Sequence, residues 1–261
     1  MTGAFSSLLI LLPLGALSFW IGWQLPNAQI VAMALLAGIL IQCSQLLYFY
    51  ALNNTEAGII AAYWNLVPVL VIILSFLFLR EVLSPIHYIG IAMLIGASIA
   101  FCRLDSNLNT RWHSLFLMII ASAMQAILIL IEDQVYQATT FLIGFGITTF
   151  GLILSGLVPI LFRHTRRQLQ QNLPILIPAA KLIIFIELIN LLALSFSGRA
   201  LDLGIPSFVS AVETTIPGYT FVLSILILAI LPHFGDPKAY SKLPIKLSLV
   251  AAMSIGVFLL S

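Results

Sequence analysis

One stretch, Leu52–Ser84, limits what this chain can fold into. It begins in a polar turn, runs through an uncharged apolar segment that contains Asn65 and Pro68, and ends at the pair Arg80–Glu81. An apolar helix of about 20 residues crosses the hydrocarbon layer of a bilayer at about 1.5 Å per residue. In lipid, a backbone carbonyl that a proline leaves without its donor must find a partner in neighbouring protein or in a wet cavity. The stretch therefore predicts a membrane helix that faces protein or water.

Composition extends this prediction to the whole chain. Hydrophobic residues make up 61% of the 261 residues and charged residues only 8%, and the mean hydropathy is +1.14. A soluble protein carries about 25% charged residues to cover its surface, so the solvent of this chain is lipid. The net charge of +2 is too small to indicate a nucleic-acid partner. Cys43 and Cys102 both fall inside predicted spans and so predict neither a disulfide framework nor a metal site.

The apolar segments predict an all-α fold, a polytopic membrane bundle of about nine transmembrane helices. Leu8–Leu25 lacks the basic start of a secretory signal peptide and is interpreted as a retained helix. A basic loop, Arg163–Arg167, is expected between the sixth and seventh spans. In the fourth span, the small residues Ala92, Gly96 and Ala100 predict close helix packing. The nine spans are Leu8–Leu25, Ile30–Ala51, Leu52–Ser84, Pro85–Phe101, Trp112–Tyr136, Thr140–Phe162, Pro174–Phe196, Pro206–Ile230 and a ninth that ends at Ser261.

The chain also carries a weak internal repeat. A shift of 149 residues places Pro68 on Pro217 (217 − 68 = 149) and Ser75 on Ser224. The third and eighth spans, which hold these pairs, are an odd number of spans apart, so they cross the membrane in opposite directions. Inverted repeats with helices interrupted at matching positions are typical of secondary transporters. The sequence therefore predicts two inverted repeats, one of four helices over residues 1–103 and one of five over residues 112–261.

Three short motifs carry a family resemblance. They are Tyr50–Leu52 (YAL), Leu66–Val69 (LVPV) and Arg80–Ser84 (REVLS). They resemble the second half of an EamA domain, of the drug/metabolite transporter superfamily, whose pattern has a YALK-type helix end, an L-x-P-V core and a GE-x-L-S turn. Arg80 stands where that pattern has glycine.

The resemblance is best over Leu35–Phe101, weaker over Trp112–Leu231 and poor over Met1–Pro26. Family members usually have ten helices in two five-helix repeats. The resemblance thus implies a permease or exporter of small solutes that lacks its first helix.

Two acids inside predicted spans are candidates for coupling or substrate binding. Glu187 lies near the middle of its span, where a charge costs about 2.5–3.5 kcal/mol. It is either a protonated acid hydrogen-bonded to a neighbouring helix, in part through Asn190, or a proton-coupling carboxylate or substrate ligand. Glu213 lies one turn before Pro217 and is interpreted as a site residue.

An uncharged polar stripe adds further candidates. Gln42, Gln45 and Tyr48 share one helix face, and Asn65 lies on the next helix. The stripe is either packing between helices or the wall of a cavity for a small solute. The full candidate set for substrate binding or coupling is Gln42, Gln45, Tyr48, Asn65, Glu187, Asn190 and Glu213.

The sequence offers little for an enzyme. It has no Walker-type loop, no HExxH pair and no GxSxG elbow, and its histidines are not spaced as metal ligands, so no catalytic residue, cofactor or metal is expected. We expect a transporter of a small metabolite or drug-like solute that works by alternating access, with proton coupling as an option. The expected partners are that solute and membrane lipid, with a homodimer as an option, in a bacterial cytoplasmic (inner) membrane. A membrane scaffold protein and a membrane-embedded enzyme remain the alternatives.

Loop charges predict the orientation, because positive residues favour the cytoplasmic side. With nine spans, Arg80 and Arg199 fall on one side. Eight positives fall on the other: Arg103, Arg111, Arg163, Arg166, Arg167, Lys238, Lys242 and Lys246. The family resemblance implies the reverse, since its GE-x-L-S turn is usually cytoplasmic.

Reporter fusions test this orientation. A reporter fused after Ser261 is expected to be active outside the cytoplasm, and one inserted after Arg167 inside it, because eight positives outweigh two. The opposite pattern would show that the family topology overrides the charges.

Overall fold

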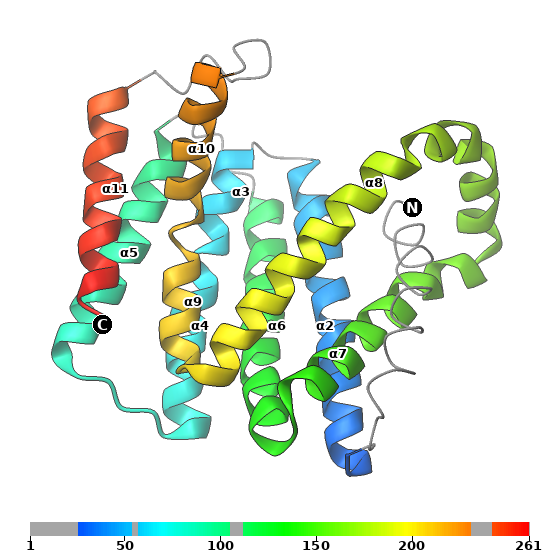
Figure 1. Ribbon diagram of the computed structural model, residues 1–261, viewed down its shortest axis with the longest axis horizontal. Coiled ribbons are helices and arrows are strands. Elements are labelled where there is room, and N and C mark those ends of the chain that lie inside the picture. Colours follow the sequence, from blue (N-terminus) through cyan, green and yellow to red (C-terminus); the bar gives the residue numbers. More distant parts are fainter. Residues whose placement is uncertain (1–25, 54–56, 105–111, 231–241, 261) are drawn as a thin grey trace. The chain divides into compact units, whose positions relative to one another are not determined.

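The computed structural model describes residues 26–53, 57–104, 112–230 and 242–260, and within these ranges it contains helices and no strand. Figure 1 shows these helices, coloured in chain order. Their bounds are α2 (Ala28–Leu52), α3 (Ala57–Trp64), α4 (Leu66–Leu74), the π-helix η1 (Ser75–Leu79), α5 (Pro85–Arg103), α6 (Trp112–Ala138), α7 (Phe141–Leu157), the 3₁₀-helix η2 (Val158–Leu161), α8 (Arg163–Leu203), α9 (Pro206–Glu213), α10 (Ile216–Ile230) and α11 (Leu243–Phe258).

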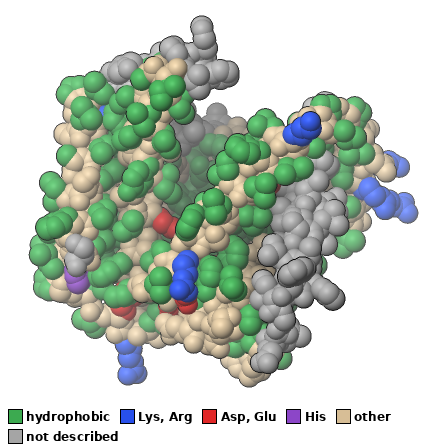
Figure 2. Space-filling view, viewed as in Figure 1, with side chains coloured by type: hydrophobic (Ala, Val, Ile, Leu, Met, Phe, Trp, Pro, Cys, Tyr) green, Lys and Arg blue, Asp and Glu red, His purple; other side chains and the backbone are tan. Residues whose placement is uncertain are grey.

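The predicted helical membrane fold is confirmed. Six stretches of the described residues are long and apolar enough to cross a membrane, and the shorter apolar helices Leu66–Leu79 and Leu243–Phe258 add to them. These helices correspond to the second to ninth predicted spans. The first predicted span, Leu8–Leu25, lies outside the described residues. The side chains on the face shown in Figure 2 are mainly hydrophobic, and Lys and Arg lie in a few separate groups. A surface that contacts lipid tails is expected to be apolar in this way.

Two sequence interpretations were wrong. The expected basic loop at Arg163–Arg167 is the start of α8, which runs unbroken over 41 residues and contains Pro174 and Pro178. The segment before Pro174 is rich in Arg, Gln and Leu, which favour helix, and it has no glycine to end one. Figure 1 shows that α8 bends before its long straight part, as prolines within a helix promote. Lys246, counted with the loops, lies in the first turn of α11, buried, with Nζ 5.8 Å from the centre of the Phe221 ring.

The chain divides into two compact units. Unit 1 comprises Met1–Gln45 and Ile127–Gly204, and unit 2 comprises Leu46–Ala126 and Ile205–Ser261. Each unit thus combines segments from both halves of the sequence. The two predicted repeats, residues 1–103 and 112–261, were defined by internal symmetry and not by which segments pack together. The division into these repeats stays a prediction.

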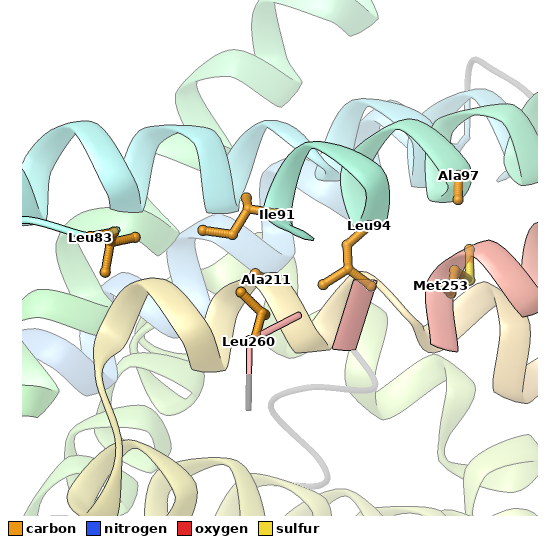
Figure 3. Close-up of a cluster of buried hydrophobic side chains, with 7 residues drawn as sticks. All are labelled: Leu83, Ile91, Leu94, Ala97, Ala211, Met253 and Leu260. Atoms are coloured by element: carbon orange, nitrogen blue, oxygen red, sulfur yellow. The ribbon is translucent and has the colours of Figure 1, made fainter. Parts of the chain in front are cut away.

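The core of unit 2 forms around α5. Figure 3 shows its buried side chains, which come from the turn before α5, from α5 itself, from α9 and from the C-terminal end of the chain. Gly90 and Gly256 let α5 and α11 come close, since a Cβ on Gly90 would lie 3.0 Å from the Gly256 carbonyl oxygen. The cluster consists of Leu83, Ile91, Leu94, Ala97, Ala211, Met253 and Leu260.

The small-residue ladder predicted for this helix was assigned to the wrong face. Ala92, Gly96 and Ala100 are all exposed, and a Cβ on Gly96 would meet nothing within 4 Å. The three residues do share a face, but α11 packs on the opposite one. Spacing identifies a face and does not say which face meets a neighbour.

In unit 1, α2 and α7 approach each other closely at two glycines. A Cβ on Gly38 would collide with the backbone of Thr148, Gly151 and Leu152, and one on Gly151 would lie 2.6 Å from the Leu35 carbonyl oxygen. The two glycines therefore let the helix backbones touch. Because lipid supplies no hydrophobic force between helices, such close packing is what stabilises their association.

Gly38→Ala tests this contact. The added methyl group meets backbone atoms that no side-chain rotation can move, so we expect the free energy of unfolding to fall by about 1–3 kcal/mol, seen as a lower unfolding temperature in detergent. Gly96→Ala is the matched control, since its methyl group enters open space, and alanine favours helix by about 1 kcal/mol over glycine. Equal effects of the two substitutions would contradict a backbone contact at Gly38.

Candidate functional site

Two helices of unit 2 are interrupted in mid-course. The first breaks at Asn65, between α3 and α4, and the second at Thr214 and Thr215, between α9 and α10. The breaks at 65 and 214 are 149 residues apart (214 − 65 = 149), which is the shift of the sequence repeat. An interrupted helix leaves backbone groups unbonded, which is tolerated in a membrane only beside protein or a water-filled cavity.

A proline follows each break. Pro68 is the third residue of α4, and Pro217 is the second residue of α10. Proline has no N–H, so neither can donate to the carbonyl group four residues before it, which belongs to Trp64 in the first helix and to Glu213 in the second. Each break therefore holds a carbonyl oxygen that its own helix does not bond in the usual way.

Polar side chains at the breaks bond neighbouring carbonyl groups. Asn65 is buried, and its Nδ2 donates to the carbonyl oxygen of Ala61 at 3.2 Å. The hydroxyls of Thr214 and Thr215 donate to Ala211 and Val212 at 2.7 and 2.6 Å. These residue types thus satisfy the helix ends locally.

A cavity adjoins the second break. It has a volume of about 230 Å³ and lies between α10 and α11. Its lining is mostly apolar and includes the hydroxyl-bearing residues Thr215, Tyr219 and Ser254. Ligand pockets commonly combine an apolar lining with a few polar groups in this way.

A polar contact joins the turn after the first interrupted helix to the start of the second. Arg80 has a φ of 54°, and the Glu81 amide donates to the Ser75 carbonyl oxygen at 3.2 Å. The Glu81 Oε2 atom then accepts a hydrogen bond from the Ser207 hydroxyl at 3.0 Å, beside the N-terminus of α9. A carboxylate is favourable there because of the helix dipole.

The structure explains one sequence feature and adds one that was missed. The backbone at position 80 is in the left-handed region, which glycine adopts without steric cost. This explains why the family pattern has glycine at this position. The Glu81–Ser207 contact was not predicted, because the two residues are 126 positions apart. The only sequence signal for it was the Glu in the REVLS turn.

The seven predicted site residues are divided between the two units. Three lie in unit 2: Tyr48 packs edge-on against Trp64, with ring centres 5.3 Å apart, while Asn65 and Glu213 flank the two breaks. The other four, Gln42, Gln45, Glu187 and Asn190, lie in unit 1.

Their exposure differs. Asn65 is buried and Asn190 is exposed, whereas the other five are partly buried. The contacts within unit 2 place Tyr48 near the first break, and a common site for all seven stays a prediction. In the described ranges, no three or more His, Cys, Asp or Glu residues are grouped so as to hold a metal ion.

A double-mutant cycle tests the Glu81–Ser207 contact. A hydrogen bond to a charged group contributes about 1.5–3 kcal/mol, so Glu81→Ala and Ser207→Ala should each lower the unfolding temperature in detergent and should be strongly non-additive when combined. Ser248→Ala is the control, because its hydroxyl bonds only the Ile245 carbonyl in its own helix at 2.8 Å. Fully additive effects of the first two substitutions would mean that the contact does not form.

Known proteins resemble this chain in fold and in part of its sequence. A solved structure described only as "Crystal structure of protein" has a TM-score of 0.65 at 14% identity, covering 100% of this chain and 86% of that one, which shows the fold alone. No curated protein matches the chain.

The family comparison covers less than half of the chain. Residues 1–102 match the EamA-like transporter family. The matched range includes Met1–Pro26, where the motifs show little resemblance, and it ends before the weaker region, Trp112–Leu231. Together with the apolar helices, the match supports an integral membrane protein of the transporter type. Over residues 1–102, the predicted resemblance to EamA-type transporters of the drug/metabolite superfamily is therefore confirmed.

Proposed function

We propose that this protein carries a small metabolite or drug-like solute across a membrane by alternating access, and that it is not an enzyme. The observation that carries the proposal is the pair of interrupted helices, which break 149 residues apart, at the register of the sequence repeat. In secondary transporters, interrupted helices at matching positions of inverted repeats form the substrate and ion site near the membrane midplane.

The surroundings of the breaks suit a solute with apolar and hydrogen-bonding parts. The two interrupted helices are in contact, since α4 packs on α9, and α5 packs on α9 and α10. The cavity beside the second break has a mostly apolar lining that includes three hydroxyl-bearing residues. We infer a neutral or amphiphilic solute, which an apolar wall with few polar groups holds without desolvating a charge.

Glu213 is our choice for the coupling residue. Its side chain is partly buried, and it is the last residue of α9, directly before the second break and one turn before Pro217. Glu187 is the second candidate, partly buried on α8 among exposed apolar side chains. The sequence has no nucleotide-binding motif, so an ion gradient or exchange drives the movement. The proposed location is the inner membrane of a bacterium.

Proteoliposomes test this function. Metabolites and drug-like solutes are first screened for those that raise the unfolding temperature of the purified protein, and a hit is then followed as a labelled solute. We expect uptake that a pH gradient accelerates. Glu213→Gln and Glu187→Gln are expected to remove the acceleration without unfolding the protein, because the amide keeps the shape of the acid but carries no exchangeable charge.

Glu132→Gln is the control, a partly buried acid on α6 that we place outside the site. Native rates under a pH gradient in both single variants and in the double variant would exclude proton coupling through these acids. Binding of a solute without flux would contradict transport itself and would favour a scaffold protein, and chemical conversion of the solute would favour a membrane-embedded enzyme.

A further inference from the structure

Three arginines form a charged face at the start of α8. Arg163, Arg166 and Arg167 are all exposed, and their spacing (i, i+3, i+4) places them on one side of the helix. The opposite side is partly buried and carries Thr165, Gln168, Leu169 and Asn172. The burial pattern thus turns the three guanidinium groups away from the protein.

These arginines have no partner within the described part of the chain. Among those residues, the ion pair is Arg199–Asp202, and none of the three guanidinium groups forms a hydrogen bond or an ion pair there. The first turn of α8 has no acidic residue, and its N-cap, Phe162, supplies no side-chain hydrogen bond. Because the N-terminus of a helix is the positive end of its dipole, cations there are unfavourable unless an anion is near.

The flanking residues place this face at the edge of the membrane. Leu161 and Phe162, directly before it, are 80% and 63% exposed. The apolar membrane-spanning stretch begins 13 residues after Arg163, at Leu176 (176 − 163 = 13). A polar, basic helical segment between exposed apolar residues and a transmembrane stretch matches the interfacial region, where lipid headgroups lie.

We propose that Arg163, Arg166 and Arg167 bind the phosphate groups of anionic phospholipids in the leaflet on their side of the membrane. By the charge count, this is the cytoplasmic leaflet. The planar guanidinium group pairs with phosphate through two hydrogen bonds, and clustered arginines next to a membrane helix attract anionic lipids. This binding does not depend on the proposed transport activity.

A lipid titration of the full-length protein in a neutral detergent tests the proposal. Fluorescently labelled phosphatidylglycerol is expected to bind more tightly than labelled phosphatidylcholine, and higher salt is expected to weaken its binding. Each arginine near an anionic surface accounts for about a fivefold change in affinity. The triple variant R163Q/R166Q/R167Q should therefore bind phosphatidylglycerol roughly 100-fold more weakly, and the triple Arg→Lys variant should keep most of the affinity.

Lys181→Gln is the matched control, an exposed cation within the membrane-spanning part of the same helix, and it should leave the affinity unchanged. Equal binding of the two lipids, or an unchanged affinity in the triple Gln variant, would overturn the proposal. Complete displacement of the lipid by millimolar inorganic phosphate would assign the face to a free anion instead. The salt titration uses the native protein, so binding that is independent of salt would overturn the proposal even if the triple variant did not fold.

Discussion

The need to bond every backbone group inside a bilayer governs this structure. Helices meet that need by themselves, so a helix that stops and restarts within the membrane has to be supported from outside its own hydrogen-bond ladder. At the first break, the Asn65 amide bonds the Ala61 carbonyl, and at the second, the hydroxyls of Thr214 and Thr215 bond carbonyls one turn back. Both interrupted helices also pack against α5 or its neighbours in unit 2. The breaks are therefore supported features of the fold, and a supported break is what a membrane transporter uses to present backbone groups to a solute.

The same solvent explains why glycine decides the helix contacts. Lipid tails are as apolar as leucine, so burying leucine against another helix gains little, and close approach of the backbones matters more. Gly38 and Gly151 allow this between α2 and α7, and Gly90 and Gly256 allow it between α5 and α11. Gly96 does not, although its spacing with Ala92 and Ala100 is the expected one. Which glycine is at a contact depends on how each helix is rotated, and that is set by all of its neighbours together.

The sequence predicted the parts of the fold that depend on local composition. Apolar length predicted the spans, and the register of Pro68 with Pro217 pointed to the matching regions where the third and eighth spans are interrupted. It misjudged Arg163–Arg167 because charge and a later proline suggested a loop, whereas Arg, Gln and Leu favour helix and continue α8. It also chose site residues by depth within a span. Depth does not determine which faces meet, and thus Tyr48, Asn65 and Glu213 lie in one compact unit while Gln42, Gln45, Glu187 and Asn190 lie in the other.

The turn at Arg80 shows how a local conformation and a long-range contact depend on each other. Arginine in the left-handed region costs about 1–2 kcal/mol, which glycine would avoid. That conformation ends η1 and lets the Glu81 amide reach the Ser75 carbonyl, and the Glu81 side chain then bonds Ser207 at the start of α9. The end of one interrupted helix is thereby tied to the beginning of the other. The alternating-access motion that we propose must either move α4, this turn and α9 together or break the Glu81–Ser207 bond in each cycle. Because α4 and α9 also pack directly against each other, we propose that α4, the turn and α9 move together as one body. The helices would then bend at the two breaks.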